Sequence, residues 1–190
     1  IEDPARSLLG RAQESWLFGE LAESKRAGVT WQVLGQQVMF AHTAPAGAPA
    51  TNTDTWDGYR PARDRVLDFL QQQDIRNAVI LTGDIHSSWA FDVPRDPWRG
   101  YDARSGRGAV AVEFATPAVS SPSSMGAPDQ AIETMRQRMN ELPHLRWVEG
   151  LHRGYMVLDV RADRIQNDWY FVPTVSERSA QETFAKGFVS

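Results

Sequence analysis

The 190-residue sequence predicts an α/β protein built on a mixed β-sheet, and three observations carry this prediction. The first is an unbroken apolar run over 78–81, rich in β-branched residues, which is typical of a strand buried on both faces. The second is the order strand, loop, helix, strand that leads to this run and indicates a crossover connection. The third is a pair of apolar runs that flank a polar turn near the carboxyl end and predict a hairpin.

Composition excludes several classes of function. With 42% hydrophobic residues the chain can bury a core, and its net charge of -4 gives no basic footprint for nucleic acid. No apolar run is long enough to span a bilayer. The chain has no cysteine, so any metal must be held by oxygen and imidazole ligands. Because the sequence begins at Ile1 without a methionine or a signal peptide, we expect a fragment or a processed product.

In the first half of the chain, apolar residues at three- and four-residue steps predict a helix over 7–26, with Trp16 and Leu21 on its buried face. A strand is predicted over 30–40, with a polar interruption at 35–37. A loop over 43–55, rich in Ala, Pro and Gly, and a helix over 61–73 then lead to the buried strand.

In the second half, the same criteria predict further strands, one helix and the hairpin. The predicted elements are strands 89–93 and 109–114, a hydroxyl-rich loop 116–124, a helix 128–142 and hairpin strands 155–160 and 165–172. We expect 176–190 to be a peripheral tail, which leaves 1–175 as one structural unit.

The segment after the buried strand contains the best candidates for chemistry. Asp84 and His86 stand two residues apart, so in an extended segment their side chains point to the same side and offer an oxygen and a nitrogen ligand. They lie at the carboxyl end of the strand, where open α/β sheets bind their ligands. In the alternative interpretation, Asp84 caps a turn and His86 makes a loop hydrogen bond.

Two other polar and aromatic segments are candidates for a pocket. Trp56, Asp57 and Tyr59 form a compact segment that is either an active-site wall or a well-packed turn. His152 and Arg153 precede the hairpin and could return to the end of the sheet that carries His86, although for His152 a loop role is the favoured interpretation.

Six blocks, in the same order along nearly the whole chain, resemble the C-terminal part of alkaline phosphatase D-type (PhoD-like) metallophosphoesterases. The matching blocks are Leu9-Gly10 with Gln13 and Trp16-Leu17; Trp31-Gln32-Val33-Leu34 with Gln36-Gln37-Val38; Asp54 with Trp56-Asp57-Gly58-Tyr59; Leu81-Thr82-Gly83-Asp84-Ile85-His86-Ser87-Ser88-Trp89; Val112-Glu113-Phe114; and Arg153-Gly154-Tyr155.

The resemblance implies a metallophosphoesterase-like αββα sandwich of two mixed sheets, of which 1–175 is the C-terminal part. It also implies a multinuclear centre of calcium and iron, hydrolysis of phosphate monoesters and in some relatives diesters, and a periplasmic or extracellular location. Asp84 and His86 match metal ligands, and Ser87 would lie near the pocket with Trp56 and Tyr59.

The earlier metal-binding blocks of the family do not occur in this sequence. Two protein ligands cannot hold two or three cations against water. We therefore expect the N-terminal part of the same catalytic domain, as a separate chain, to complete the site.

Three other functions are compatible with the sequence. The first is a phosphodiesterase of the same fold, and the second is a catalytically silent structural half. The third is a carbohydrate- or ligand-binding module that uses Trp56, Tyr59 and Trp89 as an aromatic platform.

Overall fold

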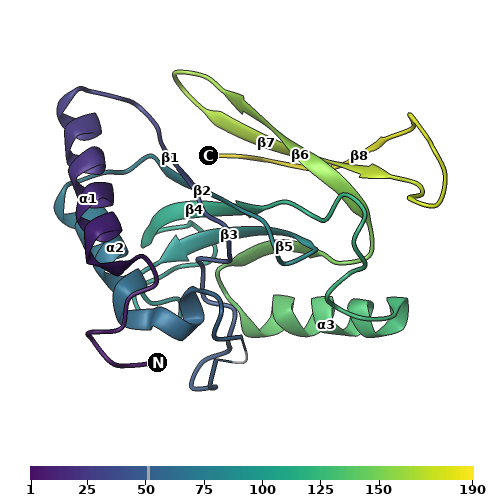
Figure 1. The fold of residues 1–190 in the computed structure, drawn as a ribbon, viewed down its shortest axis with the longest axis horizontal. Coiled ribbons are helices and arrows are strands. Elements are labelled where there is room, and N and C mark those ends of the chain that lie inside the picture. The colour runs from purple at the N-terminus through teal and green to yellow at the C-terminus, as the bar shows by residue number, and fades with distance from the viewer. Residues whose placement is uncertain (51) are drawn as a thin grey trace.

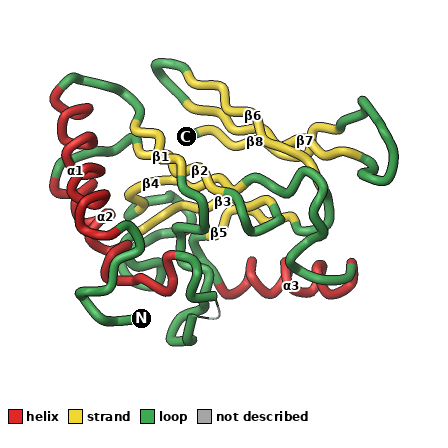
Figure 2. The backbone as a smooth tube through the Cα atoms, viewed as in Figure 1, coloured by secondary structure: helices red, strands yellow, loops and turns green. Residues whose placement is uncertain are grey.

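A computed structural model describes residues 1–50 and 52–190 as three α-helices, one short 3₁₀ helix and eight strands (Figures 1 and 2). Thr51, inside the predicted loop 43–55, lies outside the described residues. The helices are α1 (Gly10–Arg26), η1 (Trp56–Tyr59), α2 (Arg60–Gln72) and α3 (Pro128–Glu141). The strands are β1 (Gln32–Gly35), β2 (Ala78–Thr82), β3 (Ser88–Pro94), β4 (Ala109–Ala115), β5 (Leu145–Glu149), β6 (Arg153–Val160), β7 (Ile165–Val172) and β8 (Thr183–Val189).

The larger sheet is mixed, as predicted. Its five strands lie in the order β1-β2-β4-β3-β5, in which β1, β2 and β4 are parallel and the other pairings are antiparallel. The β2 strand pairs on both sides, which agrees with its apolar sequence. The crossover through α2 therefore places the carboxyl ends of three parallel strands at one edge of the sheet.

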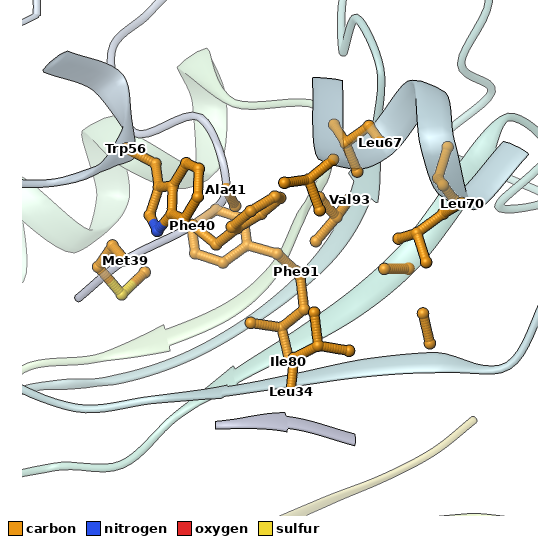
Figure 3. Packing of buried hydrophobic residues seen from close by; sticks show 14 of the residues in the cluster. Leu34, Met39, Phe40, Ala41, Trp56, Leu67, Leu70, Ile80, Phe91 and Val93 are labelled. Carbon is orange, nitrogen blue, oxygen red and sulfur yellow. The ribbon is translucent and has the colours of Figure 1, made fainter. Parts of the chain in front are cut away.

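The two faces of this sheet bury different side chains. On one face, Ile80 of β2 joins Leu67 and Leu70 of α2 in the main hydrophobic cluster, seen from close by in Figure 3. On the other face, Val79 packs with Trp169 of β7. Because alternate residues of a strand point to opposite faces, the single apolar run of β2 serves both cores.

The second sheet consists of β6, β7 and β8 in that order (Figure 1). Among the described strands all of its pairings are antiparallel, so the expectation that both sheets are mixed is wrong for this one. The fully buried Trp169 donates from its indole nitrogen to the Ala115 carbonyl at 3.0 Å, which ties the two sheets together. The outer helical layer of an αββα sandwich stays a prediction.

Several predicted elements differ from the structure. The strand expected over 30–40 ends at Gly35, and Trp16, expected on the buried face of its helix, is 60% exposed because α1 lies at the edge of the sheet. Two strands were not predicted, namely β5 and β8, and β8 lies within the segment that was expected to be a tail. No described helix is long and apolar enough to cross a membrane.

Candidate functional site

Asp84 and His86 lie between β2 and β3, after the carboxyl end of β2 as predicted, but in a bend and not in the extended segment that was expected. Both have left-handed backbone conformations, with φ of 65° for Asp84 and 56° for His86. A non-glycine residue in this region costs on the order of 1–3 kcal/mol and persists only where surrounding contacts hold it. Two such residues within three positions are typical of a turn shaped for function rather than for stability.

The ring of His86 is oriented by a backbone group. Its Nδ1 lies 3.1 Å from the carbonyl oxygen of Pro122. Because a carbonyl can only accept, Nδ1 carries the proton in this contact, and the lone pair is left on Nε2. Metal-binding histidines are held in the same way, by a hydrogen bond from the nitrogen that does not ligate.

The carboxylate of Asp84 is exposed and free. No described residue makes a hydrogen bond or an ion pair with its oxygens. The alternative interpretation is confirmed for one residue only: no bond from the Asp84 side chain to a described residue caps the turn, whereas His86 makes the loop hydrogen bond that this interpretation predicts. A backbone bond from Ile85 to the Gly83 carbonyl, 2.7 Å long, closes the turn instead.

The donor set suits a hard or borderline cation, because it combines a carboxylate with an imidazole nitrogen. Within residues 1–50 and 52–190, however, no group of three or more His, Asp or Glu side chains is arranged to hold a metal ion. The chain therefore offers two ligands at this turn and not a complete site.

The hydroxyl-rich loop 116–124 lies against the turn. Ser124 donates its hydroxyl proton to the Ile85 carbonyl at 2.5 Å, and the same loop supplies the Pro122 carbonyl to His86. Next to Pro122, the Ser121 carbonyl accepts a hydrogen bond from Arg153 Nε at 3.0 Å. The loop thus connects Arg153 to the end of the sheet that carries His86.

His152 is held away from this turn by its own neighbours. Its Nδ1 lies 3.0 Å from a carboxylate oxygen of Glu149, and its ring stacks on Phe171 with centroids 5.0 Å apart. Of the two residues that precede the hairpin, only Arg153 contacts the loop beside His86.

Three of the other candidates are buried. Trp56 and Asp57 are each 1% exposed, and Ser87 is fully buried. Trp56 packs against Phe40 (Figure 3) and donates to the Gln36 side chain at 2.8 Å. Ser87 accepts a 2.7 Å hydrogen bond from the Trp89 indole. In this chain these side chains support the turn and the core and present no surface to a substrate.

Tyr59 lies elsewhere. It is partly exposed, and the guanidinium of Arg6 stacks over its ring at 4.3 Å. The structure therefore does not bring Tyr59 together with His86.

Asp57 belongs to a buried charge cluster that the sequence did not reveal. One of its oxygens accepts from Arg63 Nη1 at 2.8 Å, and the other accepts from the backbone nitrogens of Thr43 and Ala44 and from the Thr43 hydroxyl. Burial opposes its ionisation, but the charge of Arg63 and these hydrogen bonds lower the pKa of Asp57 below its ordinary value.

Two histidines complete this cluster. Arg63 donates to His42 Nδ1 at 2.7 Å, and His144 Nε2 donates to the His42 carbonyl at 2.9 Å. Burial, with the nearby Arg63 charge, lowers the pKa of His42 to about 2, and burial lowers the pKa of His144 to about 4. Both rings are neutral at ordinary pH.

Glu113 fixes the same irregular segment, 39–44, from the sheet side. It is fully buried in β4 and accepts from the backbone nitrogens of Phe40 and Ala41 at 2.9 and 2.7 Å. Burial raises the pKa of Glu113 to about 7. The sequence carried one signal for this role, because a single acidic residue interrupts the apolar run of its strand.

A cavity of about 280 Å³ adjoins the turn. It is lined by apolar side chains, among them Met39, Ile85 and Trp89, and by polar ones, among them Thr43, Ser124 and Arg138. Met39 and Thr43 of segment 39–44 form one wall of this cavity, which the turn reaches through Ile85, and the buried cluster holds that wall in place.

Comparison with known proteins gives a consistent result. A family model described as PhoD-like phosphatase matches residues 1–169. Alkaline phosphatase D of Bacillus subtilis (strain 168) is 33% identical over 189 residues, which are 98% of this chain and 30% of that protein. A solved structure entitled "Structure of PhoD" superposes with a TM-score of 0.82 at 32% identity and covers 98% of this chain and 34% of that one.

The chain thus spans about a third of the length of each of these two relatives. Its blocks, its mixed sheet and its aspartate-histidine turn all fall within the matched region. This chain belongs to the PhoD-like phosphatase family.

Proposed function

We propose that this chain supplies Asp84 and His86 as metal ligands to a phosphate-ester hydrolase, an alkaline phosphomonoesterase, whose other ligands come from the remainder of its catalytic domain. One observation carries the proposal: an exposed, unpaired Asp84 and an oriented His86 share a left-handed turn at the end of a buried parallel strand. Family membership supports a phosphatase, and the resemblance implies calcium and iron as the ions.

The roles of the side chains follow from their contacts. An Asp84 oxygen and His86 Nε2 would hold the ions, and the Pro122 carbonyl, by accepting a hydrogen bond from Nδ1, favours the tautomer with its lone pair on Nε2. When bound, the ions polarise phosphoryl oxygens and lower the pKa of an attacking water.

Arg153 is the candidate for contact with the phosphate group. Its Nε and Nη1 donate to the carbonyls of Ser121 and Leu151, at 3.0 and 3.1 Å, and Nη2 has no hydrogen-bond partner among the described residues. A guanidinium held by two backbone carbonyls loses little freedom when its remaining nitrogen binds an anion, which makes it an effective phosphate ligand.

The remainder of the domain is proposed as a partner, present as a separate chain, and a periplasmic or extracellular location of the assembled enzyme is proposed from the family resemblance. Absence of cysteine is compatible with export. Intact-mass analysis of the protein purified from its source tests the first point, and cell fractionation tests the second.

The test of function uses the purified protein with every polypeptide that accompanies it. We expect bound metal and hydrolysis of p-nitrophenyl phosphate, and we expect Asp84→Asn and His86→Asn to remove both. Bis(p-nitrophenyl) phosphate, assayed in parallel, tests the diesterase alternative.

The chain offers a matched control in Asp74→Asn. Asp74 is also an aspartate in the left-handed region, with φ of 50°, but it pairs with Arg76 on the surface. Loss of metal in the Asp84 variant with retention in the Asp74 variant supports the proposal. Full metal content and activity in the Asp84 variant would contradict it.

A further inference from the structure

The cavity that the turn reaches through Ile85 has an unbalanced charge. Its lining combines four apolar side chains, five neutral polar ones and one guanidinium, that of Arg138. Among the described residues that line it, none is acidic. A concave site with a cation and several polar neutral groups, and without an acid, favours a ligand that carries negative charge.

Arg138 lies on the face of α3 that packs against the rest of the protein. Ala131, which is fully buried, and Met135, which packs on the main hydrophobic cluster, stand seven and three residues before it. Residues at this spacing share one face of a helix. The helix therefore turns the guanidinium toward the cavity and not toward the solvent-exposed side of α3.

Most of the hydrogen-bonding capacity of Arg138 is unused by the described chain. Its Nη1 donates to the Thr43 carbonyl at 3.0 Å, whereas no described residue bonds with Nε or Nη2 and no described carboxylate pairs with the charge. The bond to Thr43 thus orients the guanidinium without neutralising it.

The two free nitrogens form the fork that binds a carboxylate. A guanidinium binds both oxygens of a carboxylate through two parallel N–H groups. Elsewhere in this structure Arg65 uses the same two nitrogens, Nε and Nη2, to bind the two oxygens of Glu14 at 2.7 and 2.8 Å. Arg138 offers that geometry to a carboxylate that the described chain does not supply.

The place of the cavity suggests which molecule brings this carboxylate. Ile85, which lines the cavity, stands between Asp84 and His86 in the chain, and Ser124 of the lining donates to the Ile85 carbonyl. The volume of about 280 Å³ is just below the range of about 300–1,000 Å³ for drug-sized ligands, so it suits a small alcohol.

We infer that this cavity takes the alcohol part of the phosphate ester and that Arg138 selects small alcohols that carry a carboxylate. The inference rests on the proposed function, because it assigns a substrate class to the site of Asp84 and His86. Arg138 acts in it as a residue that determines specificity and takes no part in the chemical step.

A pair of substrates that differ in one group tests the selection. The protein, with its metal and every polypeptide that accompanies it, is assayed with 2-carboxyethyl phosphate and with propyl phosphate. We expect kcat/KM to be at least about tenfold higher for the carboxylate-bearing ester, as a charge-assisted hydrogen bond to its alcohol part requires. Equal or lower kcat/KM for this ester would overturn the inference.

Two arginines of α3 provide a variant and its matched control. Arg138→Gln removes the charge and the fork, whereas Arg136→Gln removes an exposed charge that pairs with Glu133. We expect the preference for 2-carboxyethyl phosphate to fall at least about fivefold in the first variant and to stay unchanged in the second. An unchanged preference in Arg138→Gln, or an equal loss for both substrates, would overturn the inference, because Arg138 would then only hold segment 39–44.

Binding of the alcohol alone tests the cavity without turnover. In methyl NMR spectra, we expect 3-hydroxypropanoate to shift the methionine signals of Met39 and Met125, which line the cavity, and not that of Met139, which is exposed on α3. The shifts should be absent with 1-propanol and in Arg138→Gln. Equal shifts with both alcohols, or no shift at about 100 mM 3-hydroxypropanoate, would overturn the inference.

The two readouts distinguish the possible failures. If neither ester is hydrolysed but 3-hydroxypropanoate still shifts Met39 and Met125, the proposed function is refuted and the carboxylate site stands. If both esters are hydrolysed with equal kcat/KM and no methionine signal shifts, the carboxylate site is refuted and the proposed function stands.

Discussion

Two aspartates in this chain stand next to glycines in short turns, and the structure gives them opposite surroundings. Asp57 is 1% exposed and accepts hydrogen bonds from Arg63, Thr43 and Ala44. Asp84 is exposed, lies on a left-handed backbone and has no hydrogen-bond partner among the described residues. Both oxygens of the Asp57 carboxylate accept hydrogen bonds within the fold, whereas the oxygens of Asp84 are free to bind a ligand.

The difference shows how to separate a structural acid from a functional one. A buried carboxylate with several donors stabilises the segment that supplies those donors, here the irregular backbone of 39–44. An exposed carboxylate on a strained turn contributes little to stability, and the ligand proposed above would explain its position. Each prediction below tests this contrast.

The largest expected effect is on the buried side of the comparison. Asp57→Asn leaves the fully buried Arg63 without a counter-charge, and breaking a buried pair in this way costs about 3–5 kcal/mol. Urea unfolding with a tryptophan fluorescence readout measures this loss. A change below about 1 kcal/mol would mean that the cluster does not hold the segment.

At the exposed turn, Asp84→Asn removes a proposed metal ligand without removing a stabilising contact. We expect the free energy of unfolding of the metal-free protein to change by less than about 0.5 kcal/mol. Metal affinity should fall by at least about 100-fold, measured by competition with a chelator. Similar losses in the free energy of unfolding of the Asp57 and Asp84 variants would contradict the distinction between a structural and a functional aspartate.

Acid should weaken the buried cluster selectively. Folding lowers the pKa of His42 to about 2 and that of His144 to about 4, from an ordinary 6.5. Below pH 6.5 both histidines are therefore protonated in the unfolded chain and neutral in the folded one, so the free energy of unfolding falls as pH falls. Glu113, raised to about 7 from 4.5, acts in the opposite direction, and its contribution to stability is lost as pH rises toward 7.

Between pH 6.5 and 4.5 the unfolded chain binds two protons, on His42 and His144, and the folded chain binds one, on Glu113. The free energy of unfolding should therefore fall by about 1.4 kcal/mol for each pH unit of acidification in this range. Glu113→Gln removes the opposing group, so its slope should be about twice as steep. Urea titrations at pH 7.5, 6 and 5 measure both slopes, and equal slopes would contradict the assignment to this cluster.

A comparably small effect on stability is expected from the backbone strain at His86. His86→Gly relieves a left-handed φ of 56° but loses the hydrogen bond to Pro122, and these contributions are of similar size. We therefore expect unfolding free energy to change by less than about 1 kcal/mol while metal binding is lost. A loss of several kcal/mol would assign His86 a structural role.

Local patterns predicted much of the fold and the candidate turn. The apolar run of β2 and the glycine after it located Asp84 and His86, because burial on both faces requires continuous apolar sequence. The antiparallel hairpin and the three α-helices followed from their periodicity and turn residues.

Long-range contacts decided the rest. Asp57 and Asp84 each stand next to a glycine, and what separates them is the position of Arg63 and the burial that α2 provides. In β8, Lys186 and Gly187 interrupt the apolar pattern, and the strand exists because it pairs with β7. The predicted strand over 30–40 ends early because Glu113 and Asp57 bind the backbone of the following segment.

Segment 39–44 also carries a consequence for the order of folding. Side chains from four distant positions hold its backbone. Counted along the chain between the two bonded residues, these hydrogen bonds span 14 positions for Asp57, 73 for Glu113, 95 for Arg138 and 102 for His144. Loops of that length must close before any of these bonds can form, and such closures slow folding. The wall of the cavity beside the turn of Asp84 and His86 is therefore completed only after α3 and β5 have docked, so we expect this cavity to form late in folding.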